Sequence, residues 1–314
     1  MHFVGIDLAW SPRNTSGGAI LSVDGDLLRA TSTLGNDQDV LDFAIEAIPQ
    51  GSSGLVAIDA PLAVPNESGS RPCDRELASV FRHFHAGPHP VNRRNLTRYG
   101  GLRGEAIAQK LGALGFAHDP CIRPLFASRQ AVEVFPHPAT VSLFNLGRIL
   151  RYKNRRGRGY ALRWRELARL RDGLVGLAGS NPPLRLPDHI VGMQIEGRRG
   201  KAFKEVEDLL DSIVCAYSAL YAWYHGPRGY AVYGRGSLDD PPPMAGRNQK
   251  PHILVPMTPE IWPRVRTRRL LFLDRDGTLN ESLGTRPPNH PDEIMLLPGV
   301  AATLHWYASM AVSY

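Results

Sequence analysis

The sequence is poor in cysteine. Its 314 residues include three cysteines, Cys73, Cys121 and Cys215, and no two of them form a CxxC pair. This number and spacing exclude a disulfide framework and a zinc knuckle. Unpaired cysteines are typical of the reducing cytoplasm, which is where we expect the protein to act.

Long apolar runs and a basic leader are also missing. The uncharged run at residues 212–224 is too short to cross a bilayer and directly follows Asp211. The first residues contain Asp7 and no basic, apolar leader, so we expect neither a signal peptide nor a membrane partner. With 43% apolar and 21% charged residues, the composition is that of a globular protein rather than a fibrous or disordered one.

The hydrophobic pattern predicts an α/β protein. Strands are expected at residues 3–7, 18–23 and 27–33, the last two joined by an Asp-Gly-Asp turn, followed by a helix at 37–48 and a strand at 55–58. Residues 65–130 are rich in loops, with one helix near 75–84. A short strand at 132–134 and a helix at 203–224 follow, and the helix must be buried nearly all round in its second half. Weak strands are expected at 230–232 and 252–256.

The positive charge is concentrated in one segment. Residues 148–171 contain ten basic side chains and a single acid, Glu166, whereas the net charge of the whole chain is only +7. Clustered arginines release counterions from a phosphate backbone, and interleaved aromatic rings can stack on bases. The segment therefore predicts a nucleic-acid partner, with Arg155, Arg156 and Arg158 as substrate-binding residues. The alternative is an ordinary solvated helix.

Four acids lie at the ends of buried elements: Asp7, Asp59, Glu133 and Asp211. Carboxylates in such places are costly unless they are paired or bound to cations. Hard divalent cations take oxygen ligands, and two of them can clamp the attacking and leaving oxygens of a phosphodiester. Alternatively, each acid has a local task, as a turn acid or, for Asp211, in a salt bridge to Arg198, Arg199 or Lys201.

Five stretches carry a resemblance to a known family. They are GIDLAW (5–10), AIDAPLAVP (57–65), CDREL (73–77), EVFPHPA (133–139) and DLLDSIVCAYSAL (208–220). Over residues 1–258 the chain resembles the domain-of-unknown-function family 429, a group of predicted RNase H-like nucleases. The resemblance implies a mixed sheet with flanking helices and a Mg²⁺- or Mn²⁺-dependent phosphodiesterase. It further implies Asp7, Asp59 and Asp211 as metal ligands and Glu133 as a fourth acid. The CDREL stretch would lie beside these acids, with Arg75 as a substrate-binding residue, or with Arg75 or Glu76 contacting the metal.

A second motif follows a proline-rich linker at residues 259–267. An apolar stretch, residues 270–273, delivers Asp274 and Asp276 into a Gly turn, where one could attack a phosphate and the other donate a proton. Over residues 268–308 this resembles the haloacid dehalogenase-like phosphatases that act on heptose bisphosphate or histidinol phosphate. The later strands that such an enzyme needs do not follow, so we interpret residues 268–314 as a truncated phosphatase segment.

Three functions therefore remain open at this point. We expect metal-dependent cleavage of a nucleic acid by the first domain. A phosphatase acting on a sugar phosphate through Asp274 is one alternative, and a nucleic-acid-binding module without catalytic activity is another.

Overall fold

The computed structural model describes residues 1–98, 100–234, 250–265, 281, 292 and 295–302. The chain divides into two compact units, Met1–Val265 and Arg266–Tyr314. Asp274 and Asp276 lie outside the described residues. The fold and the sites described below lie within the first unit.

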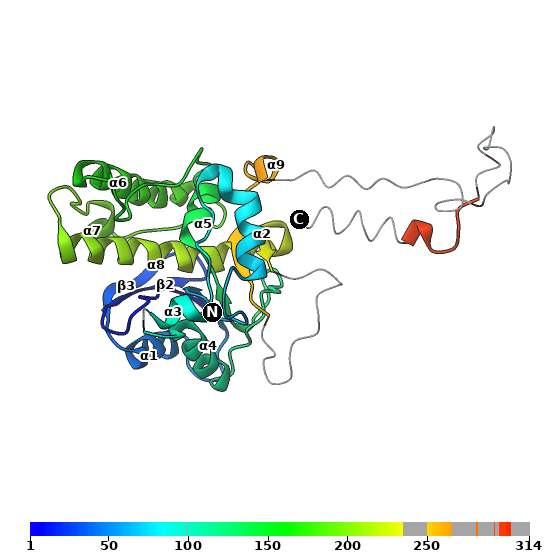
Figure 1. Ribbon diagram of the computed structural model, residues 1–314, viewed down its shortest axis with the longest axis horizontal. Helices are drawn as coiled ribbons and strands as arrows, with labels where there is room; N and C mark the ends of the chain where they lie inside the picture. The colour runs from blue at the N-terminus through cyan, green and yellow to red at the C-terminus, as the bar shows by residue number, and fades with distance from the viewer. Residues whose placement is uncertain (99, 235–249, 266–280, 282–291, 293–294, 303–314) are drawn as a thin grey trace. The chain divides into compact units, whose positions relative to one another are not determined.

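A mixed five-stranded sheet forms the centre of the first unit (Figure 1). Its strand order is β3-β2-β1-β4-β5. Strands β1 (His2–Asp7), β4 (Gly54–Asp59) and β5 (Arg129–Glu133) run parallel. Strand β2 (Ser16–Ser22) pairs antiparallel with β1, and β3 (Leu27–Leu34) pairs antiparallel with β2. The expected α/β class, with a mixed sheet and flanking helices, is thus confirmed.

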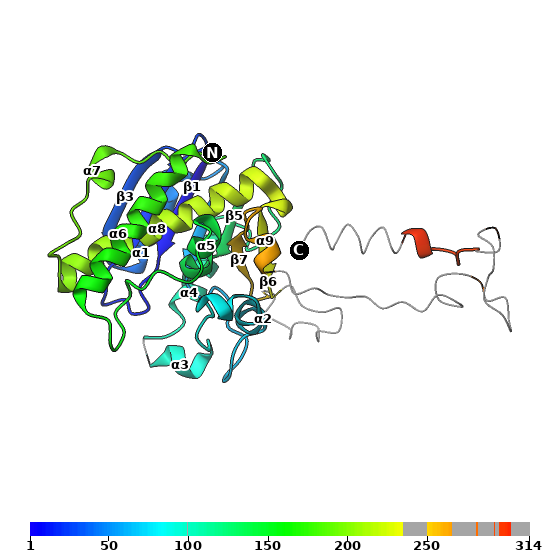
Figure 2. The same cartoon turned by 90° about the horizontal axis from the view of Figure 1, so that it is seen from above.

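Helices cover both faces of this sheet (Figure 2). Helices α1 (Asp37–Ala47) and α4 (Arg103–Ala113) pack on one face, against alternate strand residues such as Ile6 and Ile58. The opposite face is covered by α8 (Gly200–His225), and α5 (Pro136–Leu143), α6 (Tyr160–Gly176) and α7 (Asp188–Val191) lie beyond it. Because side chains alternate along a strand, Phe3 and Leu55 point to this second face.

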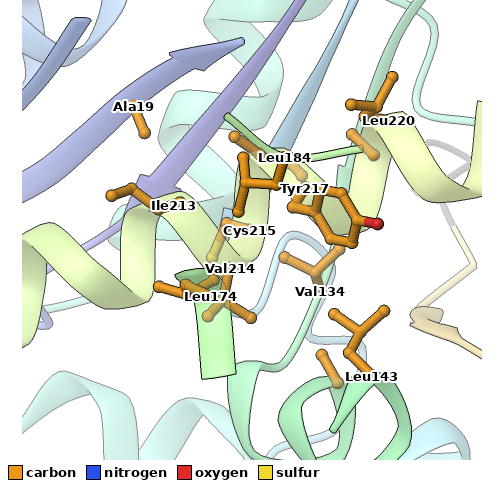
Figure 3. Packing of buried hydrophobic residues seen from close by; sticks show 14 of the residues in the cluster. Ala19, Val134, Leu143, Leu174, Leu184, Ile213, Val214, Cys215, Tyr217 and Leu220 are labelled. Atoms are coloured by element: carbon orange, nitrogen blue, oxygen red, sulfur yellow. The ribbon is translucent and has the colours of Figure 1, made fainter. Parts of the chain in front are cut away.

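Helix α8 is the central helix of the fold. After Asp211 its sequence carries no charge up to Tyr224, and the residues from Leu210 to Trp223 are all buried. Its side chains Val214 and Tyr217 pack among residues of α5, α6 and the sheet (Figure 3). The helix ends at Gly226, whose φ of 61° lies in the left-handed region that glycine tolerates best.

A smaller layer lies beside the main sheet. It contains the hairpin of β6 (Tyr230–Tyr233) and β7 (Ile253–Pro256), helix α2 (Pro72–Phe81) with the 3₁₀ turn η1 (Arg82–Phe84), and α9 (Trp262–Val265). These elements share a core that includes Leu77, Ile253 and Val265. The first unit thus continues through α9, beyond the boundary predicted at residue 258.

Some elements differ from the sequence-based expectation. Helices α3 (Arg93–Thr97) and α4 fall in the region expected to be rich in loops. The Phe-Pro-His-Pro stretch after β5 begins helix α5, because Pro136 occupies the first helical turn, where its missing N–H costs nothing. Two short 3₁₀ turns, η2 (Leu177–Gly179) and η3 (Gly226–Arg228), follow α6 and α8. Within the described ranges, no helix combines the length and apolarity needed to cross a membrane.

Candidate functional site

Two of the predicted acids lie side by side at the ends of parallel strands. The register of β1 and β4 places Asp7 directly opposite Asp59. Both therefore belong to the same sheet face as Phe3 and Leu55, the face that α8 covers. Asp7 is buried, and Asp59 is partly exposed at the rim.

Helix α8 brings three more acids to the same place. Glu207, Asp208 and Asp211 are all buried and lie within about one turn of each other. The close approach depends on two glycines: a Cβ atom at Gly5 would lie 2.1 Å from the Ser212 carbonyl oxygen, and one at Gly17 would lie 2.1 Å from that of Asp208. The five carboxylates of Asp7, Asp59, Glu207, Asp208 and Asp211 are called the acid cluster below.

The acids of the cluster are close enough to interact strongly. Burial raises the pKa of Asp7, and the neighbouring Asp211 raises it further. Burial raises the pKa of Asp59 well above its usual range, with Asp7 and Asp211 adding to the effect. Burial and Asp7 raise the pKa of Asp208 to about 8. Like charges held together in a low dielectric favour protons or a cation between them.

Two lysines partly neutralise the acid cluster. The Lys153 Nζ atom lies 2.6 Å from Asp211 Oδ2 and 3.1 Å from Glu207 Oε1. Lys204 forms ion pairs with Glu207 and Asp208. Burial alone would lower the pKa of Lys153, but Asp211, Asp7 and Glu207 raise it well above its ordinary value, so this lysine stays charged. The partner of Asp211 is thus Lys153, not one of the basic residues at 198–201 considered from the sequence.

The five carboxylates face two ammonium groups, and the Arg163 guanidinium lies 4.0 Å from Glu207 Oε2. Asp7 Oδ2 is buried and accepts no hydrogen bond from the described residues. Hard oxygen atoms of this kind match the ligand preference of Mg²⁺ or Mn²⁺.

As they stand, however, the side chains of the described residues include no group of three His, Cys, Asp or Glu arranged to hold a metal ion. Lys153 instead forms ion pairs with both Asp211 and Glu207. The carboxylate oxygens of the acid cluster are suitable ligands for a divalent cation. For such a cation to bind, Asp211 would have to release the Lys153 ammonium group.

Glu133 lies on the opposite face of the sheet. The register pairs it with Ile58, one residue before Asp59, so its side chain points away from α8. Arg71 donates hydrogen bonds of 2.6 Å to Glu133 Oε1 and 2.9 Å to Oε2, and the Leu62 backbone N–H donates to Oε2. Arg71 also binds Asp74 through two nitrogens. Through these hydrogen bonds Glu133 anchors the loop after β4 and the start of helix α2.

Asp74 helps to cap the N-terminus of helix α2, although it is not the N-cap residue itself. It is the third residue of α2, and its carboxylate accepts a hydrogen bond from the backbone N–H of Arg71, the N-cap residue. Arg75 is exposed and donates to the Ser70 carbonyl oxygen. Asp74 thus bonds to Arg71, and Arg75 to Ser70, rather than to the acid cluster. Sequence reasoning did not single out Arg71, because nothing in its neighbourhood predicts a partner 62 residues away.

The basic segment does not form one continuous surface. Arg155 and Arg158 line a cavity of about 490 Å³, which Arg156, although exposed, does not line. In α6, Arg163 is buried and donates to the Tyr152 carbonyl oxygen, and Arg169 pairs with Glu166. The segment thus comprises a loop whose arginines line the cavity and a helix in which Arg163 and Arg169 have partners within the fold.

His137 lies between the acid cluster and that cavity. It is the second residue of α5, and its ring packs 5.9 Å from that of Tyr152, whose hydroxyl donates to Asp211 Oδ1 over 2.7 Å. Burial and the positive charge of Lys153 lower the pKa of His137 to about 4, so it is neutral at pH 7. In the sequence His137 stands out only as part of the EVFPHPA stretch, which does not reveal this environment.

The fold and the site define a mixed α/β protein with acids at the carboxyl ends of parallel strands. The profile of the family described as "Protein of unknown function (DUF429)" matches residues 5–233. The chain therefore belongs to this family, as the five sequence stretches predicted. No curated protein and no solved structure matches the chain.

Proposed function

We propose that the first unit hydrolyses phosphodiester bonds of a nucleic acid with the help of a divalent cation. The observation that carries the proposal is the convergence of Asp7, Asp59 and Asp211 from β1, β4 and α8. The strand order β3-β2-β1-β4-β5, with two hairpin strands and three parallel ones, supports an RNase H-like assignment. The acids then occupy the strand ends and the helix that this fold uses for its chemistry.

Each group of residues has a distinct task in this proposal. Asp7, Asp59 and Asp211 would hold Mg²⁺ or Mn²⁺, which stabilises the charge that develops on a phosphate during hydrolysis. Lys153 and Lys204 balance the remaining acids, so that Glu207 and Asp208 can stay buried. Arg155 and Arg158 attract the phosphate backbone. Glu133 and Arg71 position the loop after β4 without contacting the substrate.

The proposal is tested with end-labelled DNA and RNA oligonucleotides, single- and double-stranded, incubated with Mg²⁺ or Mn²⁺ and with EDTA. We expect cleavage that EDTA abolishes and that Asp7→Asn reduces by at least about 100-fold, the scale on which lost active-site electrostatics act. Asp42→Asn is the matched control, because it makes the same chemical change on an exposed position of α1. Equal activity of Asp7→Asn and the parent chain would disprove the proposal.

Binding without cleavage is the second candidate, and one observation favours it. The Lys153 ammonium group already occupies two acids of the cluster. If this ion pair is permanent, the site is neutralised and the chain binds nucleic acid without cutting it. Oligonucleotide binding with no cleavage under any metal condition would identify this function. Release of inorganic phosphate from a sugar phosphate, lost in Asp274→Asn, would instead identify the phosphatase alternative.

A further inference from the structure

A basic cavity opens between the helix α2 region and the loop before α6. Its volume is about 490 Å³, within the range of ligand sites. Its charged lining consists of five arginines and one histidine, Arg82, His85, Arg148, Arg151, Arg155 and Arg158. None of the described residues that line it is acidic. This set is called the arginine pocket.

The arginines of the pocket are not consumed by ion pairs. Arg151 Nε is buried and has no hydrogen-bond partner among the described residues. The side chain of Arg155 contacts His89, and that of Arg158 donates to the Lys153 carbonyl oxygen. Burial lowers the pKa of Arg158, and the charges of Arg155 and Arg151 lower it further. The pocket therefore holds cations that repel one another, and a bound anion would reduce this repulsion.

Glu166 is the acid that lies nearest in the chain to the pocket arginines at positions 148–158, and it is already engaged. Its carboxylate accepts a hydrogen bond from the Arg151 backbone N–H and forms an ion pair with Arg169, outside the pocket. It does not line the pocket. The positive charge of the pocket thus remains available to a ligand.

One residue links the pocket to the acid cluster. The carbonyl oxygen of Lys153 accepts a hydrogen bond from Arg158, while its ammonium group binds Asp211 and Glu207. The electrostatic neighbours of His137 likewise include Asp211 on one side and Arg155 and Arg158 on the other. A chain of phosphates bound in the pocket would therefore reach the acid cluster across Lys153.

We propose that the arginine pocket binds consecutive backbone phosphates of a single nucleic-acid strand and thereby holds the neighbouring phosphodiester at the acid cluster. Guanidinium groups bind phosphate oxygens in a bidentate fashion, and five of them exceed what one phosphate requires. The proposal rests on the proposed function for its second half, whereas strand binding by the pocket stands independently of cleavage.

The test measures binding of a fluorescent single-stranded oligonucleotide by anisotropy, in EDTA, at about 50 and 200 mM salt. The variant Arg82→Gln/Arg155→Gln removes two exposed pocket arginines. Arg29→Gln/Arg185→Gln is the matched control, because it removes the same charge from two exposed ion pairs outside the pocket. Thermal unfolding of both variants checks that they fold.

We expect the pocket variant to bind at least about tenfold more weakly, and the slope of log affinity against log salt to fall by roughly 1.4, about 0.7 for each lost phosphate contact. The control variant should keep both the affinity and the slope. Equal losses in the two variants would overturn the proposal, because only the overall charge would then matter. Absence of binding by the parent chain would overturn it as well.

Inorganic tripolyphosphate serves as a competitor. If it displaces the oligonucleotide at an equal or lower concentration of phosphate groups, the pocket is a site for free polyphosphate and the assignment to a nucleic-acid strand is wrong. Strand binding through the pocket without any cleavage would contradict only the proposed function. Cleavage that is unaffected in the pocket variant would contradict only the pocket.

Discussion

At the residue scale, Arg71 is the most fully bonded charged side chain near the site. Its guanidinium group and backbone contact Asp74, Glu133 and the Ala63 carbonyl oxygen, and the side chain is only 1% exposed. Burial alone would lower the pKa of Arg71, but Glu133 raises it well above its ordinary value. Two buried carboxylates therefore depend on this single cation.

Removing that cation should be strongly destabilising. We expect Arg71→Met to lower the free energy of unfolding by about 3–5 kcal/mol, because it leaves two buried acids without their partner. Urea unfolding of the variant measures the loss. The control is Arg75→Met, which replaces an exposed arginine four residues further along the chain. This variant should change the free energy of unfolding by less than about 0.5 kcal/mol. If the free energy lost in Arg71→Met is as small as that in Arg75→Met, the ion pairs of Arg71 contribute little to stability.

His137 should make stability depend on pH. Its pKa in the folded chain, about 4, lies below the ordinary value of 6.5 because of burial and the positive charge of Lys153. Between these values the unfolded chain binds more protons, so the contribution of His137 to the unfolding free energy rises as the pH increases from 4 to 6.5. It is lost as the pH falls through this interval.

The measurement is urea unfolding at several pH values within that interval. We expect His137→Gln to lower the slope of stability against pH in this interval, because the buried acids with raised pKa values, such as Asp208, keep their opposite contribution. The exposed control His189→Gln should retain the slope of the parent chain. The same slope in His137→Gln and the parent chain would mean that His137 titrates normally in the fold.

At the element scale, the contact between α8 and the sheet depends on glycine. The Cβ atom of an alanine at position 5 would lie 2.1 Å from the Ser212 carbonyl oxygen and 2.2 Å from the Ala216 backbone nitrogen. Both are backbone atoms of α8, so no side-chain rotation relieves the clash. The helix that carries Asp208 and Asp211 must then move away from β1.

We therefore expect Gly5→Ala to destabilise the chain by about 1–3 kcal/mol or more, as overpacking does, and to weaken any function of the acid cluster. Gly176→Ala is the matched control, because Gly176 is helical at the end of α6 and a Cβ atom there meets no other atom within 4 Å. Alanine at that position should be neutral or slightly stabilising. Chemical denaturation of both variants distinguishes the two cases.

The main elements were predictable because their signals are local. The short apolar runs of β1 and β4 and the uncharged second half of α8 predicted both the type of these elements and the positions of Asp7, Asp59 and Asp211. What brings Lys153 to Asp211, or Arg71 to Glu133, is a contact between distant segments that no local period reveals. Likewise, Arg82 joins Arg155 only through the packing of η1 against the loop before α6.

At the scale of the whole molecule, the first unit should be stable without the second. It extends to Val265, and its core includes Ile261 and Val265, while Arg264 binds the carbonyl oxygens of Asn145 and Leu146. A chain that ends at Val265 should unfold in urea at the same concentration as the first unit of the full chain. A chain that ends at Thr258 should lose several kcal/mol, about 1.5–3 for each buried aliphatic side chain removed. Equal midpoints for the two shortened chains would show that α9 contributes nothing.

The central claim is that the acid cluster is a divalent-cation site next to a phosphate-binding surface, and Mn²⁺ binding followed by electron paramagnetic resonance tests it most directly. We predict that the parent chain binds Mn²⁺, that Asp59→Asn weakens this binding, and that Lys153→Met strengthens it by removing the ammonium group that competes for Asp211. Asp42→Asn should bind as the parent chain does. A parent chain that leaves Mn²⁺ free even at millimolar concentration, with Lys153→Met no better, would contradict the account.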